Sequence, residues 1–155
     1  MTWINTIRYE EATGKLKKLY DRVKGPDDNV DNIMLAHSLR PHTMEGHMAL
    51  YKYVLHHSGN IIPKWFLELL GVYTSLLNDC NYCVEHHYAG LKRLIKDDNR
   101  ALQMRLALES NQLKNCFSEK ESAALNYCKT LTMTAGLLNQ DVIVLLRDLG
   151  WTDGE

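Results

Sequence analysis

Apolar residues recur at intervals of three and four along almost the whole chain, the spacing that places them on one face of an α-helix. No run of alternating β-branched residues and no Asn-Gly hairpin turn interrupts this pattern. The chain has 155 residues, a length that suits one domain. We therefore expect an all-α fold, a single-domain bundle of about seven to eight helices that covers residues 1–155.

Turn and capping residues divide this pattern into predicted helices. The predicted helices cover approximately residues 13–24, 33–39, 42–57, 64–77, 80–96, 98–109, 119–131 and 140–150. The helix over 64–77 is apolar around most of its circumference, which is usual for a buried helix. Asn78 or Asp79 is expected to cap the helix that follows, and Ser118 with Glu121 forms a capping box.

Composition excludes several classes of protein. Lys and Arg (18) nearly balance Asp and Glu (19), so no basic excess indicates nucleic acid or an anionic membrane as a partner. No apolar run approaches the roughly 20 residues that span a bilayer, and residues 1–10 do not resemble a signal peptide. Four cysteines are too few for a disulfide scaffold, so we expect a cytoplasmic protein whose thiols are reduced unless they take part in chemistry.

The segment Cys80-Asn81-Tyr82-Cys83 has the spacing of a redox pair. Its two thiols lie one helical turn apart, and Cys80 lies at the predicted helix N-terminus, where the positive end of the helix dipole favours a thiolate. His87 follows Cys83 by four residues and therefore lies one turn away on the same face, within reach for proton transfer. This arrangement favours an activated thiol.

Two other interpretations of the segment remain open at this point. Cys80, Cys83 and His87 could supply three ligands of a zinc ion, with another histidine as the fourth, although no second C-x-x-C or H-x-x-x-H pair accompanies them. Alternatively, the two cysteines could be small buried residues without a function. Cys116 and Cys128 lack a paired cysteine or a histidine four residues later, and we interpret both as structural.

Glu68 is the acidic residue in the apolar helix over 64–77. If buried, its carboxyl group would be poised to take a proton. If exposed, it could form an ordinary ion pair with Lys64, four residues earlier. Glu68 precedes Cys80 by twelve residues, about 18 Å along a continuous helix, so only a fold-back of the next helix can bring it to the thiols.

Together, Glu68, Cys80, Cys83 and His87 form the motif E-x11-C-x2-C-x3-H, which resembles the alkylhydroperoxidase D-like branch of the carboxymuconolactone decarboxylase superfamily. The segments around residues 9–14, 30–34 and 136–138 are similar to the peroxidase-related subgroup, so the likeness covers nearly the whole chain. It implies an all-α fold of the alkylhydroperoxidase D-like type and assembly into homotrimers or homohexamers.

The resemblance also implies an activity. Cys83 would be the peroxidatic thiol, Cys80 the resolving thiol, and His87 with Glu68 a proton relay. The expected function is a thiol-dependent peroxidase or disulfide reductase without a bound cofactor or metal, acting on hydroperoxides in antioxidant defence. A dithiol such as a lipoyl group or a thioredoxin-like protein would reduce it again. The alternatives are a non-catalytic zinc-binding or interaction module, and a carboxymuconolactone decarboxylase-type enzyme, in which the C-x-x-C pair would have no role.

The chain departs from the pattern of this family at three places. Leu67 replaces a basic residue that often precedes the glutamate, and Tyr82 stands where some members have a second histidine. Thr152 and Glu155 form a capping box with no helix after it. We therefore expect that the chain lacks a final C-terminal helix that its relatives have.

Overall fold

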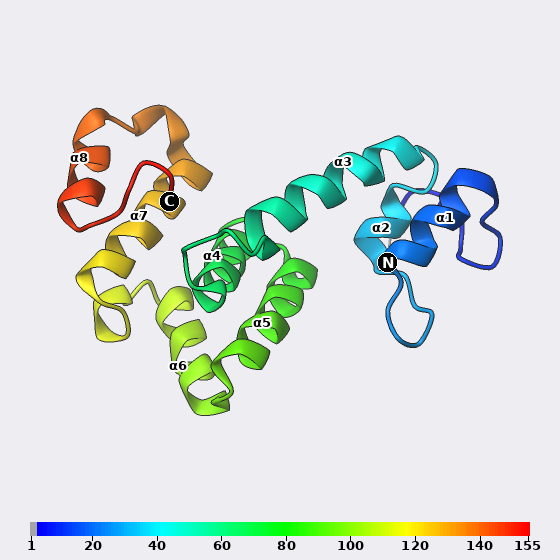
Figure 1. Cartoon of the computed structure of the whole chain (residues 1–155). Helices are drawn as coiled ribbons and strands as arrows, with labels where there is room; N and C mark the ends of the chain where they lie inside the picture. Colours follow the sequence, from blue (N-terminus) through cyan, green and yellow to red (C-terminus); the bar gives the residue numbers. More distant parts are fainter. Residues whose placement is uncertain (1–2) are drawn as a thin grey trace. The chain divides into compact units, whose positions relative to one another are not determined.

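A computed structural model describes residues 3–155 of the chain (Figure 1). It contains eight α-helices and no β-strand within that range, so the all-α prediction is confirmed. The helices fall into two compact units, one that ends at Ser58 and one that covers Gly59–Glu155. The expectation that 1–155 acts as a single domain stays a prediction, and its first two residues lie outside the described part.

The first unit contains α1 (Gly14–Val23), α2 (Asn32–Ala36) and α3 (Pro41–Tyr51). Pro41 is the first residue of α3, where its missing N–H costs no hydrogen bond. The unit has its own small core, formed by Ala12, Leu16, Leu19, Tyr20, Met34 and Met44. The Tyr20 hydroxyl donates a 2.8 Å hydrogen bond to the carbonyl of Ile7, which fastens the segment before α1 to this core.

The end of the third predicted helix differs from the expectation. Instead of one α-helix over 42–57, α3 ends at Tyr51 and residues Lys52–His56 form a π-helical turn. A π-turn holds more residues than an α-turn and rotates the side chains that follow it. Val54, which an α-helix over 42–57 would place on the apolar face, lies in this turn and is 53% exposed.

The second unit contains the remaining five helices, and it positions all four residues of the motif. These helices are α4 (Lys64–Leu77), α5 (Asn81–Ile95), α6 (Asp98–Glu109), α7 (Glu119–Thr134) and α8 (Gln140–Asp148). In Figure 1, α4 and α5 lie side by side as a hairpin, and this pair has the most extensive contact between elements in the described chain.

Helix α4 is the centre of the second unit, as its apolar circumference predicts. Phe66, Leu69, Val72 and Tyr73 are at most 2% exposed and pack in one cluster with residues of α5, α6 and α7. An ion pair between Arg105 and Glu85 (2.9 Å) connects α6 to α5 at the surface, and a second pair of Arg105, with Glu109 (2.8 Å), lies within α6. The sequence therefore buries α4 and leaves polar residues on the outer helices.

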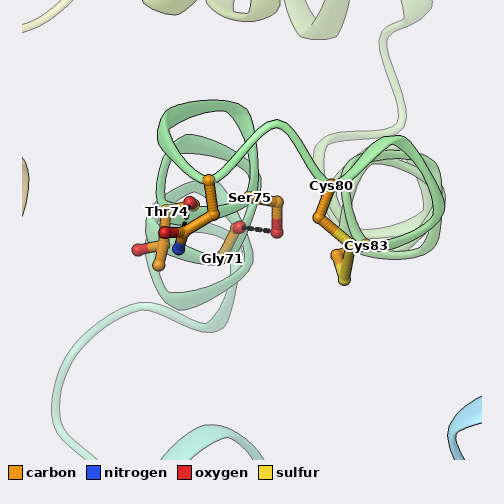
Figure 2. Close-up of a disulfide and its surroundings, with 6 residues drawn as sticks. Gly71, Thr74, Ser75, Cys80 and Cys83 are labelled. Atoms are coloured by element: carbon orange, nitrogen blue, oxygen red, sulfur yellow. Dashed lines mark hydrogen bonds between the residues drawn. A yellow bond between two sulfur atoms is a disulfide. The ribbon is translucent and has the colours of Figure 1, made fainter. Parts of the chain in front are cut away.

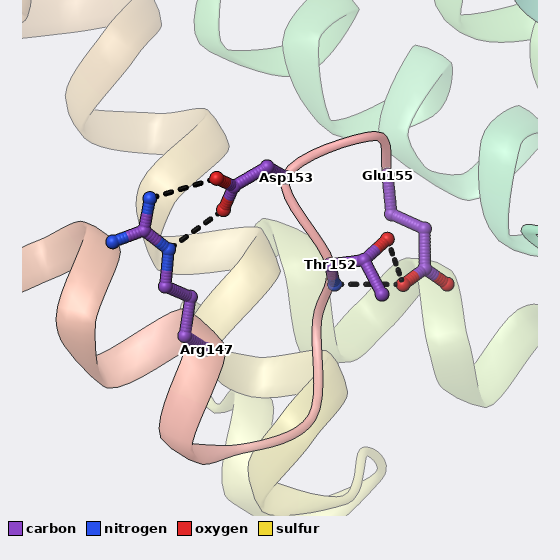
Figure 3. A network of polar contacts seen from close by, with 4 residues as sticks. All are labelled: Arg147, Thr152, Asp153 and Glu155. Atoms are coloured by element: carbon purple, nitrogen blue, oxygen red, sulfur yellow. Dashed lines mark hydrogen bonds and ion pairs between the residues drawn. The ribbon is translucent and has the colours of Figure 1, made fainter.

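Side chains cap the starts of α6 and α7, the second as predicted. The Asp97 side chain accepts a hydrogen bond from the Arg100 N–H, and Ser118 with Glu121 forms the full capping box at the start of α7. At Thr152 only half of the predicted box forms: the Glu155 carboxylate accepts from both the N–H (2.8 Å) and the hydroxyl (2.9 Å) of Thr152, while the Glu155 N–H donates to the Thr152 carbonyl (Figure 3). A bidentate ion pair between Arg147 and Asp153 holds the same turn against α8.

No helix within residues 3–155 is long and apolar enough to cross a membrane.

Candidate active site

A three-residue link, Asn78 to Cys80, joins α4 to α5 and reverses the direction of the chain. Asp79 adopts a left-handed backbone conformation with φ of 53°, which Asp tolerates better than most residues. The N–H of Cys80 then donates a 3.0 Å hydrogen bond to the carbonyl of Ser75. Cys80 is therefore the N-cap residue of α5, and the prediction that Asn78 or Asp79 caps this helix is wrong, because Asp79 forms the turn itself.

Cys80 and Cys83 are joined by a disulfide at the N-terminus of α5 (Figure 2). Their Cα atoms are 5.3 Å apart, which is the separation that one helical turn provides. Both residues are half-buried, so a small molecule can reach them from solvent. Both also lie at the positive end of the α5 dipole, where a reduced sulfur is favoured as a thiolate.

Glu68 and His87 form a pair between α4 and α5. The Glu68 side chain is 9% exposed and that of His87 is 18% exposed. The His87 Nδ1 lies 2.9 Å from Oε2 of Glu68. The fold-back of α5 thus brings Glu68 to the helix that bears the thiols, and its side chain is buried there rather than exposed.

The hydrogen bond to Glu68 also orients the imidazole. An ionised carboxylate only accepts hydrogen bonds, so Nδ1 of His87 donates to Glu68 when that group is charged. Nε2 is the other nitrogen of the ring, and Cys83 lies one turn earlier on the same helix.

Two glycines allow this close approach, and the sequence analysis did not identify them as part of the site. A Cβ atom on Gly71 would lie 2.5 to 2.8 Å from ring atoms of His87, and one on Gly90 would lie 2.7 to 2.9 Å from the carboxyl group of Glu68. Each helix thus presents a glycine to the functional side chain of the other. Their spacing is a signal: Gly71 follows Glu68 by three residues, and Gly90 follows His87 by three.

The other candidate residues lie elsewhere or have no special environment. Cys116 and Cys128 are unpaired and half-buried, and burial raises the pKa of the Cys116 thiol. Leu67 is buried, and Tyr82 is 43% exposed with its ring centroid 6.2 Å from that of His86. Within residues 3–155, no three His, Cys, Asp or Glu side chains are arranged to hold a metal ion.

Two larger cavities do not include the motif. One, of about 620 Å³, is lined by Phe66, Leu70 and Thr74 of α4 together with residues of α7 and α8. The other, of about 770 Å³, lies in the first unit between α1 and α3. Neither of these cavities is lined by Glu68, Cys80, Cys83 or His87.

The geometry can be compared with known proteins. A crystal structure described as an alkylhydroperoxidase AhpD core, an uncharacterized peroxidase-related protein from Ralstonia eutropha, superposes with a TM-score of 0.80. The alignment covers 97% of this chain and 77% of the other, at 22% sequence identity. The chain has the AhpD-core fold.

This comparison confirms the alkylhydroperoxidase D-like fold expected from the motif. No protein-family model and no curated protein sequence matches the chain. At 22% identity the AhpD-core likeness concerns the fold, and the activity has to be argued from the residues of this chain.

Proposed function

We propose that the protein is a thiol-dependent peroxidase that reduces hydroperoxides through Cys83 and Cys80. The observation that supports this most directly is the coincidence of a C-x-x-C disulfide with a buried Glu68–His87 pair one helical turn away. A structural disulfide has no need of a histidine held by a buried carboxyl group. A peroxidase needs both a thiolate and a proton carrier.

The reaction begins with the reduced protein. Nε2 of His87 accepts the proton of the Cys83 thiol, and Glu68 stabilises the imidazolium through the 2.9 Å hydrogen bond at Nδ1. The thiolate attacks one oxygen of the hydroperoxide, the O–O bond breaks, and Cys83 becomes a sulfenic acid. The leaving alkoxide takes the proton from His87 and departs as an alcohol.

Cys80 then resolves the intermediate. Its thiol attacks the sulfur of the Cys83 sulfenic acid, the S–O bond breaks, and water leaves as the disulfide forms. The Cα separation of 5.3 Å lets this happen without unwinding α5. An external dithiol, such as a lipoyl group or a thioredoxin-like protein, reduces the disulfide by exchange and is itself oxidised. We further propose that the protein works as a homotrimer or homohexamer.

Intact-mass analysis and peptide mapping test this function. Reduced protein is treated with one equivalent of cumene hydroperoxide, and we expect rapid loss of two hydrogens from the peptide that contains Cys80 and Cys83. Cys83→Ser should abolish the reaction, and Cys80→Ser should leave a sulfenic acid that dimedone traps on Cys83. Cys128→Ser serves as the matched control and should react like the wild type. Two unmodified thiols in the wild type after treatment would refute the peroxidase proposal.

The proton relay has its own test. Glu68→Gln keeps the shape of the side chain but removes the negative charge that stabilises the imidazolium. We expect a slower reaction with hydroperoxide, by about tenfold or more, with the disulfide still formed. An unchanged rate would exclude Glu68 from the relay and leave the thiol chemistry in place.

A further inference from the structure

The facing positions of α4 and α5 follow one antiparallel register. Glu68 lies against Gly90, and Gly71 lies against His87. The step of three residues from Glu68 to Gly71 toward the C-terminus of α4 thus matches the step of three residues from Gly90 to His87 toward the N-terminus of α5. Four further residues forward lead to Ser75, and four further residues back lead to Cys83. The same register that aligns the Glu68–His87 pair therefore places Ser75 opposite Cys83.

Ser75 is one of the few buried polar residues of the described chain, with 7% of its surface exposed. Its hydroxyl donates a 2.6 Å hydrogen bond to the carbonyl of Gly71. Its own carbonyl accepts the 3.0 Å hydrogen bond from the N–H of Cys80. Figure 2 shows the Ser75 side chain on the edge of α4 that faces the disulfide. The hydroxyl is thus held close to the sulfur pair and out of bulk water.

The two redox states present different acceptors to this hydroxyl. A disulfide sulfur is uncharged and a weak acceptor, so the hydroxyl hydrogen goes to the Gly71 carbonyl in the oxidised protein. Reduction creates a thiolate, and hydrogen bonds to a charged acceptor are roughly twice as strong as neutral ones. A serine hydroxyl rotates readily about its C–O bond and can exchange the carbonyl for the thiolate.

We propose that Ser75 is a hydrogen-bond donor to the Cys83 thiolate in the reduced protein and returns this hydrogen bond to the Gly71 carbonyl when the disulfide forms. The inference rests on the proposed function only in assigning Cys83 as the reactive thiol. It adds a second group that acts on the sulfur: His87 removes the proton, and Ser75 stabilises the charge that remains.

The test is a thiol titration without any peroxide. Thiolate absorbance at 240 nm is followed against pH in reduced protein that bears Cys116→Ser and Cys128→Ser, so that only Cys80 and Cys83 titrate. Ser75→Ala should raise the midpoint of Cys83 by about one unit, a tenfold loss of thiolate below the midpoint. Ser75→Thr keeps the hydroxyl and should stay near the wild-type midpoint.

Ser122→Ala is the matched control, because Ser122 is also buried in the second unit and also donates to a backbone carbonyl, that of Phe117. It should leave the midpoint unchanged. A Ser75→Ala midpoint equal to that of Ser122→Ala would overturn the proposal, as would an equal rise in Ser75→Thr.

A measurement on the wild type covers the case in which Ser75→Ala does not fold. The 13Cβ chemical shift of Ser75 should follow the Cys83 titration in the reduced protein and should not change with pH in the oxidised protein, with Ser122 as an internal reference. A 13Cβ chemical shift of Ser75 that does not change as Cys83 titrates would also overturn the proposal. A wild type that fails to react with hydroperoxide but shows the Ser75 effect would refute the peroxidase function alone.

Discussion

Gly71 is the position at which one added methyl group should disturb the Glu68–His87 pair. In Gly71→Ala the new Cβ would lie 2.5 Å from Nδ1 of His87, about 1 Å inside an ordinary van der Waals contact. The imidazole must move by about that distance, and a displacement directed away from Glu68 would lengthen the 2.9 Å hydrogen bond to about 4 Å, beyond hydrogen-bond range. The Glu68 carboxyl group already lies against Gly90, which limits its movement on that side.

The expected loss of stability can be worked from these contacts. Overpacking at a buried contact costs about 1–3 kcal/mol, and a buried carboxylate without its donor costs a further 1–3 kcal/mol or so. Alanine gains about 1 kcal/mol over glycine from helix propensity, and the backbone of Gly71 is an ordinary helical one. Gly71→Ala should therefore lower the free energy of unfolding by about 1–5 kcal/mol.

Gly46→Ala is the matched control. Gly46 lies in α3, and a Cβ there would meet no atom within 4 Å. This change should raise stability by about 0.5–1 kcal/mol. Urea unfolding followed by circular dichroism at 222 nm gives both values by linear extrapolation. If Gly71→Ala proves as stable as Gly46→Ala, the argument that the two glycines make room for the pair is wrong.

Four further predictions concern the rest of the chain. Leu91→Ala removes a fully buried side chain beside the site and should cost about 2–5 kcal/mol in the same urea assay. Ser118→Ala removes one half of the capping box of α7 and should cost about 1 kcal/mol, and Ser118→Asp should restore most of it. Burial, and secondarily the charge of His37, lower the pKa of His47 in the folded protein. As the pH falls, the unfolded chain therefore takes up this proton before the folded protein does, and the free energy of unfolding should decrease below about pH 6.5. His47→Gln should lose this part of the pH dependence of urea unfolding. Burial raises the pKa of the Cys116 thiol, so iodoacetamide at pH 7 should modify Cys83 well before Cys116 in reduced protein, as read by peptide mapping.

Much of the helical architecture could be predicted because its signals are local. Pro63 precedes the apolar helix and Asn78 follows it, so the predicted range of 64–77 agrees with α4 to the residue. The capping box of Ser118 likewise marks the start of α7. The π-turn after Tyr51 has no such signal, because a shift from i−4 to i−5 hydrogen bonds changes the backbone without requiring a particular residue.

The candidate site was inferred from its cysteine, histidine and glutamate residues, and the small residues packed against them were not identified. The spacing of Cys80, Cys83 and His87 is a property of one helix and can be derived from the sequence. The environment of Glu68 depends on the register between two helices, which the turn at Asp79 sets. Small residues such as Gly71 and Ser75 have little weight in a hydrophobic pattern, so their roles emerge only once both helices are placed.

The arrangement also explains how one helix pair can meet two opposed requirements. In the proposed reaction the sulfur pair must be accessible to a peroxide and to a second thiol, and both cysteines are half-buried at a helix end. In the proposed relay the carboxylate that polarises the base acts most strongly away from water, and Glu68 is buried nearly three turns before the link. Burial of a carboxylate is costly unless it is hydrogen-bonded, and Nδ1 of His87 supplies that bond. The distance between these environments is fixed by the register of α4 against α5, so peroxidase activity should respond more sharply to changes at Gly71 or Gly90 than to changes on the outer faces of either helix.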